Sequence, residues 1–120
     1  TLKRLPGARF DASVPVYVLT SDRTGSAAEG FAYALQQSRR GTVVGQTTLG
    51  MAHPSEEVKV NSRFLISVPI YRVQSAFTDT SFEVVGVIPD ISVPEQNALE
   101  VALKDAKKRI HDAARKRRPN

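Results

Sequence analysis

Ser26 is the side chain whose position best suits chemistry. It follows an apolar run at residues 15–19 and a turn at residues 20–25, and it begins a helix predicted over residues 26–38. The free N–H groups and the positive pole of a helix N-terminus stabilise an anion that forms beside a hydroxyl. The position therefore suits acyl transfer, with Ser26 as nucleophile and the backbone N–H of Ala27 as an oxyanion donor.

The same residues also fit a purely structural role. The sequence Ser26-Ala27-Ala28-Glu29 has the pattern of a capping box, in which the serine caps the helix and the glutamate reaches back to it. Capping boxes occur in many proteins that are not enzymes, so residue types and spacing alone favour the cap.

Two further residues are candidates for supporting roles. His53 would serve as a general base if its loop brings it within hydrogen-bond reach of Ser26, and otherwise belongs to the loop structure. Glu83 is either a solvated surface residue or a carboxylate that orients a base. The other histidine, His111, lies in a basic helix and is expected to be solvated.

The histidines and carboxylates lack the spacing of a metal site, and residues 45–50 lack the Lys-Ser/Thr ending of a phosphate-binding loop. We therefore expect no metal and no cofactor.

The elements around Ser26 predict an α/β fold. A strand at residues 15–19, the helix at 26–38 and a strand at 42–44 form a βαβ unit. Gly41 is predicted to take a left-handed conformation at the helix end. The helix should bury one face, formed by Ala28, Phe31, Ala32 and Leu35.

The remaining pattern predicts a hairpin, a strand and a long helix. Residues 58–60 and 63–70 flank the turn Asn61-Ser62. Residues 82–87 are predicted to form a further strand, and residues 95–117 a final helix. The buried stripe of that helix is predicted to consist of Leu99, Ala102, Leu103, Ala106 and Ile110.

Composition narrows the classes of function. The chain of 120 residues suits one domain, and its lack of cysteine excludes disulfides, thiolate metal sites and a cysteine nucleophile. The net charge of +5 arises at residues 104–118, where eight Lys and Arg accompany two Asp, which is typical of a solvated helix end. No nucleic-acid-binding motif is present, and no apolar run is long enough to span a bilayer.

Five stretches together resemble a known family. They are residues 16–21, 24–29, 42–48, 52–54 and 86–91. In this order and spacing they resemble the C-terminal half of the tail-specific, or C-terminal processing, serine protease family. The likeness is closest to the branch of the tricorn core protease and interphotoreceptor retinoid-binding protein. It covers residues 15–105, with 1–14 as a linker or cut edge and 106–120 as the end of the C-terminal helix and a basic tail.

The resemblance implies a ClpP/crotonase-like superhelical β-β-α domain, of which this chain is the C-terminal half. It implies Ser26 as nucleophile, Ala27 as oxyanion donor and Glu83 as the support of a base from an upstream segment. In the processing-protease branch a lysine base follows the nucleophile by twenty-five positions, and here that position is Met51. In the tricorn-like branch the base is an upstream histidine, and no histidine precedes Ser26, which leaves His53 as a possible substitute.

The resemblance therefore implies a serine-type peptidase that acts on peptides or proteins through an acyl-enzyme. It also implies a secreted or periplasmic location, and either a complementing N-terminal segment or self-association. The alternative is a catalytically silent family member that binds an apolar ligand or a peptide.

Overall fold

The computed structural model describes residues 14–116. The elements follow in the order β1 (Tyr17–Thr20), α1 (Ala27–Gln37), β2 (Thr42–Gly45), β3 (Ser55–Lys59), β4 (Leu65–Pro69), β5 (Ile91–Ser92) and α2 (Glu95–Lys116). Residues 1–13 of the expected linker (1–14) and residues 117–120 of the expected basic tail, including the last predicted helical residue Arg117, lie outside the described part. Within it, the structure confirms a mixed α/β architecture.

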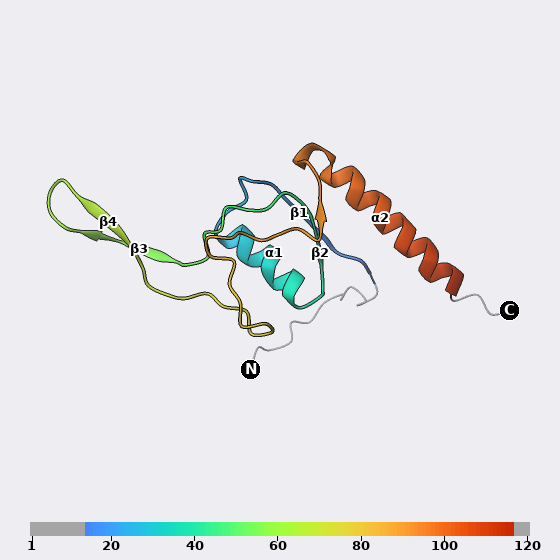
Figure 1. Ribbon diagram of the computed structural model, residues 1–120, viewed down its shortest axis with the longest axis horizontal. Coiled ribbons are helices and arrows are strands. Elements are labelled where there is room, and N and C mark those ends of the chain that lie inside the picture. Colours follow the sequence, from blue (N-terminus) through green and yellow to red (C-terminus); the bar gives the residue numbers. More distant parts are fainter. Residues whose placement is uncertain (1–13, 117–120) are drawn as a thin grey trace, which may run out of the picture.

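A parallel three-stranded sheet forms the centre of the molecule, with strand order β1-β2-β5 (Figure 1). Its middle strand supplies a core on each face, because successive side chains of a strand point to opposite sides. Val43 packs with Ala32 of α1, and Val44 packs with Ala98 of α2. This explains the continuous apolar pattern of the strands, since parallel sheets are covered on both faces.

The long helix α2 packs through small side chains, which corrects the predicted stripe. Ala98 and Ala102 are buried, whereas Leu99, Leu103 and Ile110 are each more than half exposed. Alanine lets the helix lie close to β2, so the helix turns its alanines inward and its larger apolar side chains outward.

Polar contacts fix the orientation of α2 on the sheet. The Tyr17 hydroxyl donates to Asp105 at 2.6 Å, and Arg109 pairs with the same carboxylate at 2.7 Å. Burial and this hydrogen bond raise the pKa of Tyr17 to about 12. Arg23 adds a second link, donating to both carboxylate oxygens of Glu95.

The predicted face of α1 is also corrected. Ala32 is buried, but Phe31 is 62% exposed and Ala28 is exposed, while Glu29 is fully buried. The left-handed residue at the end of this helix is Arg39, with φ 54°, and not Gly41. Gly41 instead serves close packing, because a Cβ there would lie 3.1 Å from Leu35 Cβ.

The strand predicted at residues 82–87 is wrong. Residues 83–85 form a turn in which Val84 has φ 69°, and the following Gly86 has φ 73°. These conformations are incompatible with a strand. The third strand of the sheet is β5, which pairs with β2 at Val44 and Ile91.

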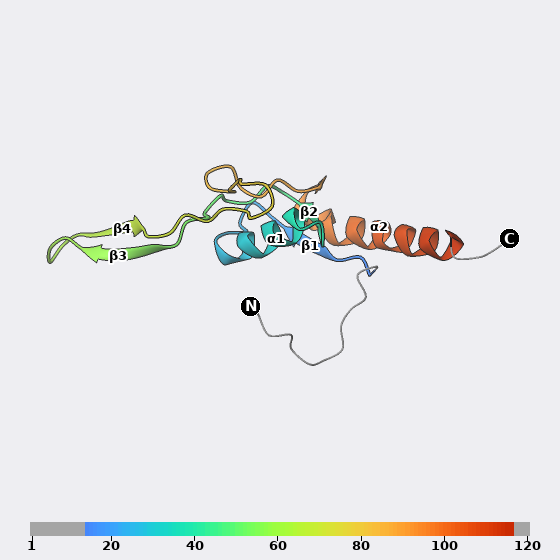
Figure 2. The same cartoon turned by 90° about the horizontal axis from the view of Figure 1, so that it is seen from below.

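The predicted hairpin is confirmed as β3 and β4, which pair antiparallel. It extends away from the sheet and helices, opposite to the free end of α2, in both ribbon views (Figure 2). The molecule is elongated as a result, with a longest extent of 75 Å. Within residues 14–116, neither helix has the length and apolarity needed to cross a membrane.

Gly45 is expected to be essential to the β1–β2 contact. It has φ 137°, and a Cβ there would lie 1.9 Å from the backbone oxygen of Thr20. Gly45→Ala should lower the free energy of unfolding by about 2 kcal/mol or more, measured by urea denaturation. Gly30→Ala is the matched control inside α1, where a Cβ meets nothing within 4 Å. That variant should be about 0.5–1 kcal/mol more stable than the parent, and equal effects of the two substitutions would contradict this account.

Candidate active site

Ser26 has an unusual backbone conformation at the start of α1. Its φ and ψ are 53° and −123°, and the residue is exposed. A residue with a Cβ pays about 1–3 kcal/mol for such a conformation, which persists only where its surroundings impose it. Sharp turns of this kind between a strand and a helix present the nucleophilic serine in α/β-hydrolases.

The backbone beside Ser26 provides a free donor. Ala27 is the first residue of α1, and within residues 14–116 its N–H donates to no protein acceptor. The neighbouring groups are engaged, since Ala28 N–H donates to Gly25 and Gly30 N–H donates to the Ser26 carbonyl. Ala27 N–H therefore lies free at the helix N-terminus, and its role as an oxyanion donor stays a prediction.

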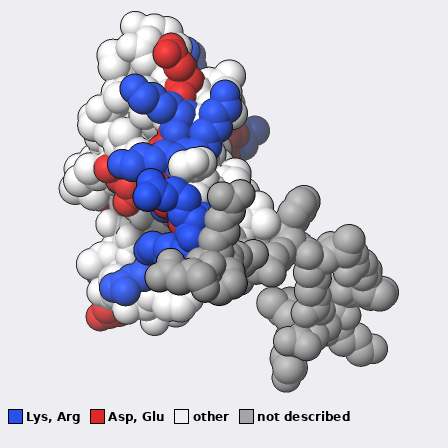
Figure 3. All heavy atoms as spheres, turned by 90° about the vertical axis from the view of Figure 1, so that its right-hand side faces the viewer, with Lys and Arg blue, Asp and Glu red and all other residues white. Residues whose placement is uncertain are grey.

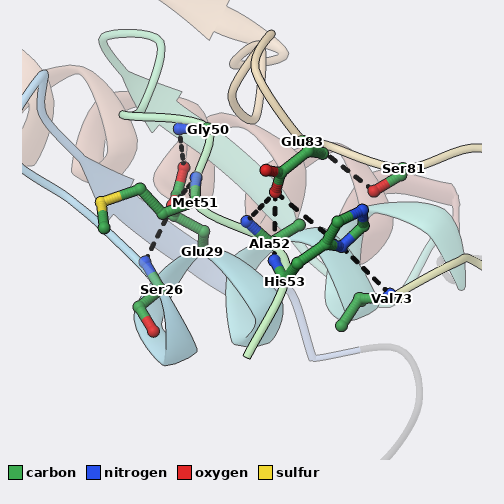
Figure 4. A network of polar contacts seen from close by, with 9 residues as sticks. All are labelled: Ser26, Glu29, Gly50, Met51, Ala52, His53, Val73, Ser81 and Glu83. Atoms are coloured by element: carbon green, nitrogen blue, oxygen red, sulfur yellow. Dashed lines mark hydrogen bonds and ion pairs between the residues drawn. The ribbon is translucent and has the colours of Figure 1, made fainter. Parts of the chain in front are cut away.

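Glu29 imposes the conformation of this turn. Its fully buried carboxylate accepts hydrogen bonds from the N–H groups of Ser26 at 2.8 Å, Gly50 at 2.6 Å and Met51 at 2.9 Å (Figure 4). The Thr48 hydroxyl donates to the same carboxylate. Burial acts to raise the pKa of Glu29, but these four hydrogen bonds outweigh it and the pKa is lowered.

The capping box predicted from the sequence is present. The Glu29 carboxylate accepts the Ser26 N–H at 2.8 Å, and the Ser26 side chain faces the backbone of Glu29 in return. In Figure 4 its hydroxyl points away from the Glu29 carboxylate. The box predicted from the sequence thus fixes the serine backbone.

Glu83 supports the loop that precedes the hairpin. Its Oε2 atom accepts the N–H groups of Ala52 at 2.6 Å and His53 at 3.0 Å, and its side chain is 35% exposed. Oε1 of Glu83 accepts no hydrogen bond from residues 14–116. One carboxylate oxygen is therefore structural, and the other remains available to a further donor.

His53 lies beside Glu83 but makes no hydrogen bond to Ser26. Its Nδ1 atom accepts Val73 N–H at 3.3 Å and lies 3.8 Å from Glu83 Oε2. Because Nδ1 acts as an acceptor, the neutral ring carries its proton on Nε2. The imidazole in Figure 4 is directed toward Glu83 and Val73, away from Ser26.

Met51 and Leu49 lie next to the turn that presents Ser26. A Cβ built on Gly25 would lie 3.1 Å from Leu49 Cδ1 and 3.9 Å from Met51 Sδ. Both side chains are more than half exposed. Position 51, which holds a lysine in the processing-protease branch that the sequence resembles, therefore adjoins the turn that carries Ser26.

Other polar and hollow features lie away from Ser26. A groove of about 780 Å³ is lined by residues 14–16 before β1, by residues 39–42 after α1 and by the second half of α2, including Arg39, Arg40 and Arg109. Lys and Arg side chains gather along the α2 side of the molecule (Figure 3). No group of three or more His, Asp or Glu suited to a metal ion occurs within residues 14–116.

Comparison with known proteins gives a consistent result. The sequence profile of Peptidase family S41 matches residues 3–93. The C-terminal processing peptidase, chloroplastic, of Tetradesmus obliquus is 30% identical over 87 residues, which are 72% of this chain and 18% of that protein.

Two solved structures are also similar. The photosystem II D1 C-terminal processing protease has a TM-score of 0.58 at 29% identity, over 68% of this chain and 21% of its own. Mature CPAF has a TM-score of 0.60 at 22% identity, over 85% of this chain and 21% of its own, which shows a shared fold. The chain thus spans about a fifth of the length of these proteins.

The buried Glu29 carboxylate should make stability sensitive to acid. Its pKa in the folded chain lies below the unfolded value of about 4.3. It therefore stabilises the fold above about pH 4.3, and this contribution is lost as pH falls toward the folded pKa. Glu29→Gln should lower the free energy of unfolding at pH 7 by about 2–4 kcal/mol and remove this part of the acid dependence.

The measurement is urea denaturation from pH 3 to pH 7. Glu57→Gln, on the exposed β3 strand, is the control and should match the parent at every pH. If Glu29→Gln keeps the parent's stability and acid dependence, the carboxylate does not impose the turn.

Proposed function

This chain belongs to Peptidase family S41, and from that premise we propose that it carries the nucleophile of a serine-type peptidase acting on peptides or proteins. The observation that carries the proposal is the conformation of Ser26 at φ 53° and ψ −123°. A capping role alone does not require this strained backbone, since N-cap residues ordinarily lie in the β region. Presentation of an exposed hydroxyl at a helix N-terminus does account for it.

The reaction forms and breaks two bonds at one carbonyl carbon. Ser26 Oγ attacks the peptide carbonyl and its proton passes to a general base, while the carbonyl oxygen becomes an anion beside Ala27 N–H. The C–N bond then breaks and the leaving amine takes the proton from the base. A water molecule hydrolyses the resulting ester by the same two steps, which returns the proton to Ser26.

Glu83 is proposed to orient the base. A carboxylate that accepts a hydrogen bond from an imidazole fixes its tautomer and stabilises its charged form. Oε2 of Glu83 is engaged by two backbone N–H groups, which hold the side chain in place, and Oε1 faces no donor of residues 14–116. A histidine supplied by an upstream segment would find this oxygen already positioned.

His53 remains a second candidate for the base. It would have to turn its ring so that Nδ1–H donates to Glu83 and Nε2 becomes the free basic atom. Nδ1 lies 3.8 Å from Glu83 Oε2 and would have to move closer by roughly 0.6–1 Å to donate a hydrogen bond there. The turn would cost the hydrogen bond from Val73.

The wider setting of the peptidase follows from the same proposal. The names of the matching relatives are those of processing peptidases, which favours a peptidase over a silent binding module. The relative from Tetradesmus obliquus is chloroplastic. A secreted or periplasmic location and a complementing N-terminal segment stay predictions for this chain.

Active-site labelling tests the nucleophile directly. A fluorophosphonate should add once to the chain, as read by intact mass, and the adduct should be lost in Ser26→Ala. Ser38→Ala is the matched control at the other end of α1, where the hydroxyl binds the Ala34 carbonyl. That variant should be labelled at the parent's rate. An adduct that persists in Ser26→Ala would assign the reactive group elsewhere.

Met51→Lys tests whether a base is the missing component. Because side chain 51 adjoins the turn of Ser26, a lysine there should accelerate labelling by at least about tenfold, more steeply at high pH where the amine is neutral. Met51→Leu should not change the rate, and Met51→Lys combined with Ser26→Ala should not be labelled. Absence of an adduct from both the parent and Met51→Lys would overturn the proposed role of Ser26.

A further inference from the structure

His53 lies at the base of the β3–β4 hairpin, where the hairpin joins the rest of the molecule. Two hydrogen bonds close this base. Ile70 N–H donates to the Pro54 carbonyl at 2.9 Å, and Val73 N–H donates to His53 Nδ1 at 3.3 Å. The Val73 side chain packs against the core cluster that contains Phe82. The contact between His53 and Val73 therefore holds the chain that returns from the hairpin close to the core.

The hydrogen bond from Val73 exists only while the imidazole of His53 is neutral. An unprotonated ring nitrogen accepts a hydrogen bond, whereas an imidazolium carries N–H on both nitrogens and accepts none. A proton on Nδ1 would point at Val73 N–H and break this contact. Histidine is the side chain that ordinarily changes charge near neutral pH.

Glu83 offers the charged ring a second partner. Its Oε2 atom lies 3.8 Å from His53 Nδ1, and dashed lines in Figure 4 join the imidazole to both Glu83 and Val73. The same oxygen accepts the His53 backbone N–H at 3.0 Å, so the backbone can stay in place while the ring changes partner. The two side chains are 22% and 35% exposed, which limits the screening of the pair by water.

Glu83 is the main electrostatic influence on the ring. Within residues 14–116 it is the one Asp or Glu that lies within 4.0 Å of an imidazole nitrogen of His53. The nearest charged residues along the chain are Glu56, which follows the loop, and Arg72, which precedes Val73, and both are exposed. Water screens exposed charges, so the Glu83 carboxylate determines how the ring responds to a proton.

We propose that His53 is a pH-dependent switch at the base of the hairpin. The neutral ring binds Val73 N–H and holds the returning chain at the core. The charged ring releases Val73 and pairs with the Glu83 carboxylate. The proton is taken from solvent, and Nδ1–H is the only covalent bond that forms.

The switch has a consequence for the proposed peptidase. A charged His53 takes up part of the negative charge of Glu83, the carboxylate proposed to orient the base, and it can no longer act as a base itself. Acid would therefore withdraw both residues from the proposed mechanism. This consequence rests on the proposed function, whereas the exchange of partners does not and is tested without any measurement of activity.

NMR spectroscopy of the ¹⁵N-labelled chain from about pH 5 to pH 8 tests the exchange. The hydrogen-exchange protection factor of the Val73 amide, which corrects for the intrinsic pH dependence of exchange, should fall at least about fivefold toward acid pH. Its chemical shift should change with the same midpoint as the ring resonances of His53. Val84 N–H, which donates to the Gly50 carbonyl, is the internal control and should keep its protection.

Two variants separate His53 from other effects of pH. His53→Asn places a carbonyl oxygen, which does not titrate, near the position of Nδ1, so the Val73 amide should stay protected throughout. His111→Asn removes the other histidine, whose side chain is 73% exposed in α2, and should match the parent chain. Val73 protection that is constant across the pH range, that falls equally in His53→Asn, or that falls together with that of Val84 would overturn the switch.

Glu83→Gln tests the second partner. Glutamine keeps an oxygen for the N–H groups of Ala52 and His53 but has no charge to attract an imidazolium. Release of Val73 should therefore require a pH lower by roughly half a unit or more than in the parent chain. An unchanged midpoint would show that the charged ring does not pair with Glu83, and this part of the proposal would be wrong.

Discussion

The buried carboxylate of Glu29 is the interaction on which the local structure depends. It lies at the first turn of α1 and gathers four donors from two segments, the serine turn and the loop that follows β2. A charge can be buried only where hydrogen bonds compensate for its lost hydration. Here all four donors bind the ionised Glu29 carboxylate directly. The resulting network offsets the backbone strain at Ser26.

The same network extends to the carboxylate proposed to orient the base. The Thr48 hydroxyl donates to Glu29 and accepts Val87 N–H, while Gly50 accepts Val84 N–H at 2.8 Å. Residues 46–52 therefore join the turn that carries Ser26 to the turn that carries Glu83. Gly86 is needed at this junction, because a Cβ there would lie 2.2 Å from the Thr48 backbone oxygen. Ser26 and Glu83 are thus positioned by one continuous set of hydrogen bonds that involves the Glu29 and Thr48 side chains and the backbone.

Local sequence patterns predicted those parts of the structure that interactions between neighbouring residues determine. The βαβ unit, the hairpin and the start of α1 followed from apolar periodicity and turn residues, and so did the location of Ser26 and Ala27 N–H. The turn at residues 83–85 was mistaken for a strand because Phe82, Val84 and Val85 have strand propensity. Close approach to the loop at residues 46–52 overrides that propensity, and a single sequence contains no signal for it. Likewise, the capping box indicated that Glu29 reaches Ser26, but not that three further donors would converge on it.

The two requirements of the proposed serine catalysis are separated in this chain. The geometry of Ser26 and of the Ala27 N–H is set by contacts within residues 14–116, through Glu29 and the first turn of α1. Proton transfer is not provided by these contacts. No basic nitrogen of residues 14–116 forms a hydrogen bond with Ser26, and His53 directs its acceptor nitrogen to Val73. The strained backbone of Ser26 is maintained only by rigid contacts with nearby residues, and one turn and one loop can supply these contacts. A base needs only to reach a prepared hydroxyl, so it can come from position 51, from His53 or from another segment without altering the turn that presents Ser26.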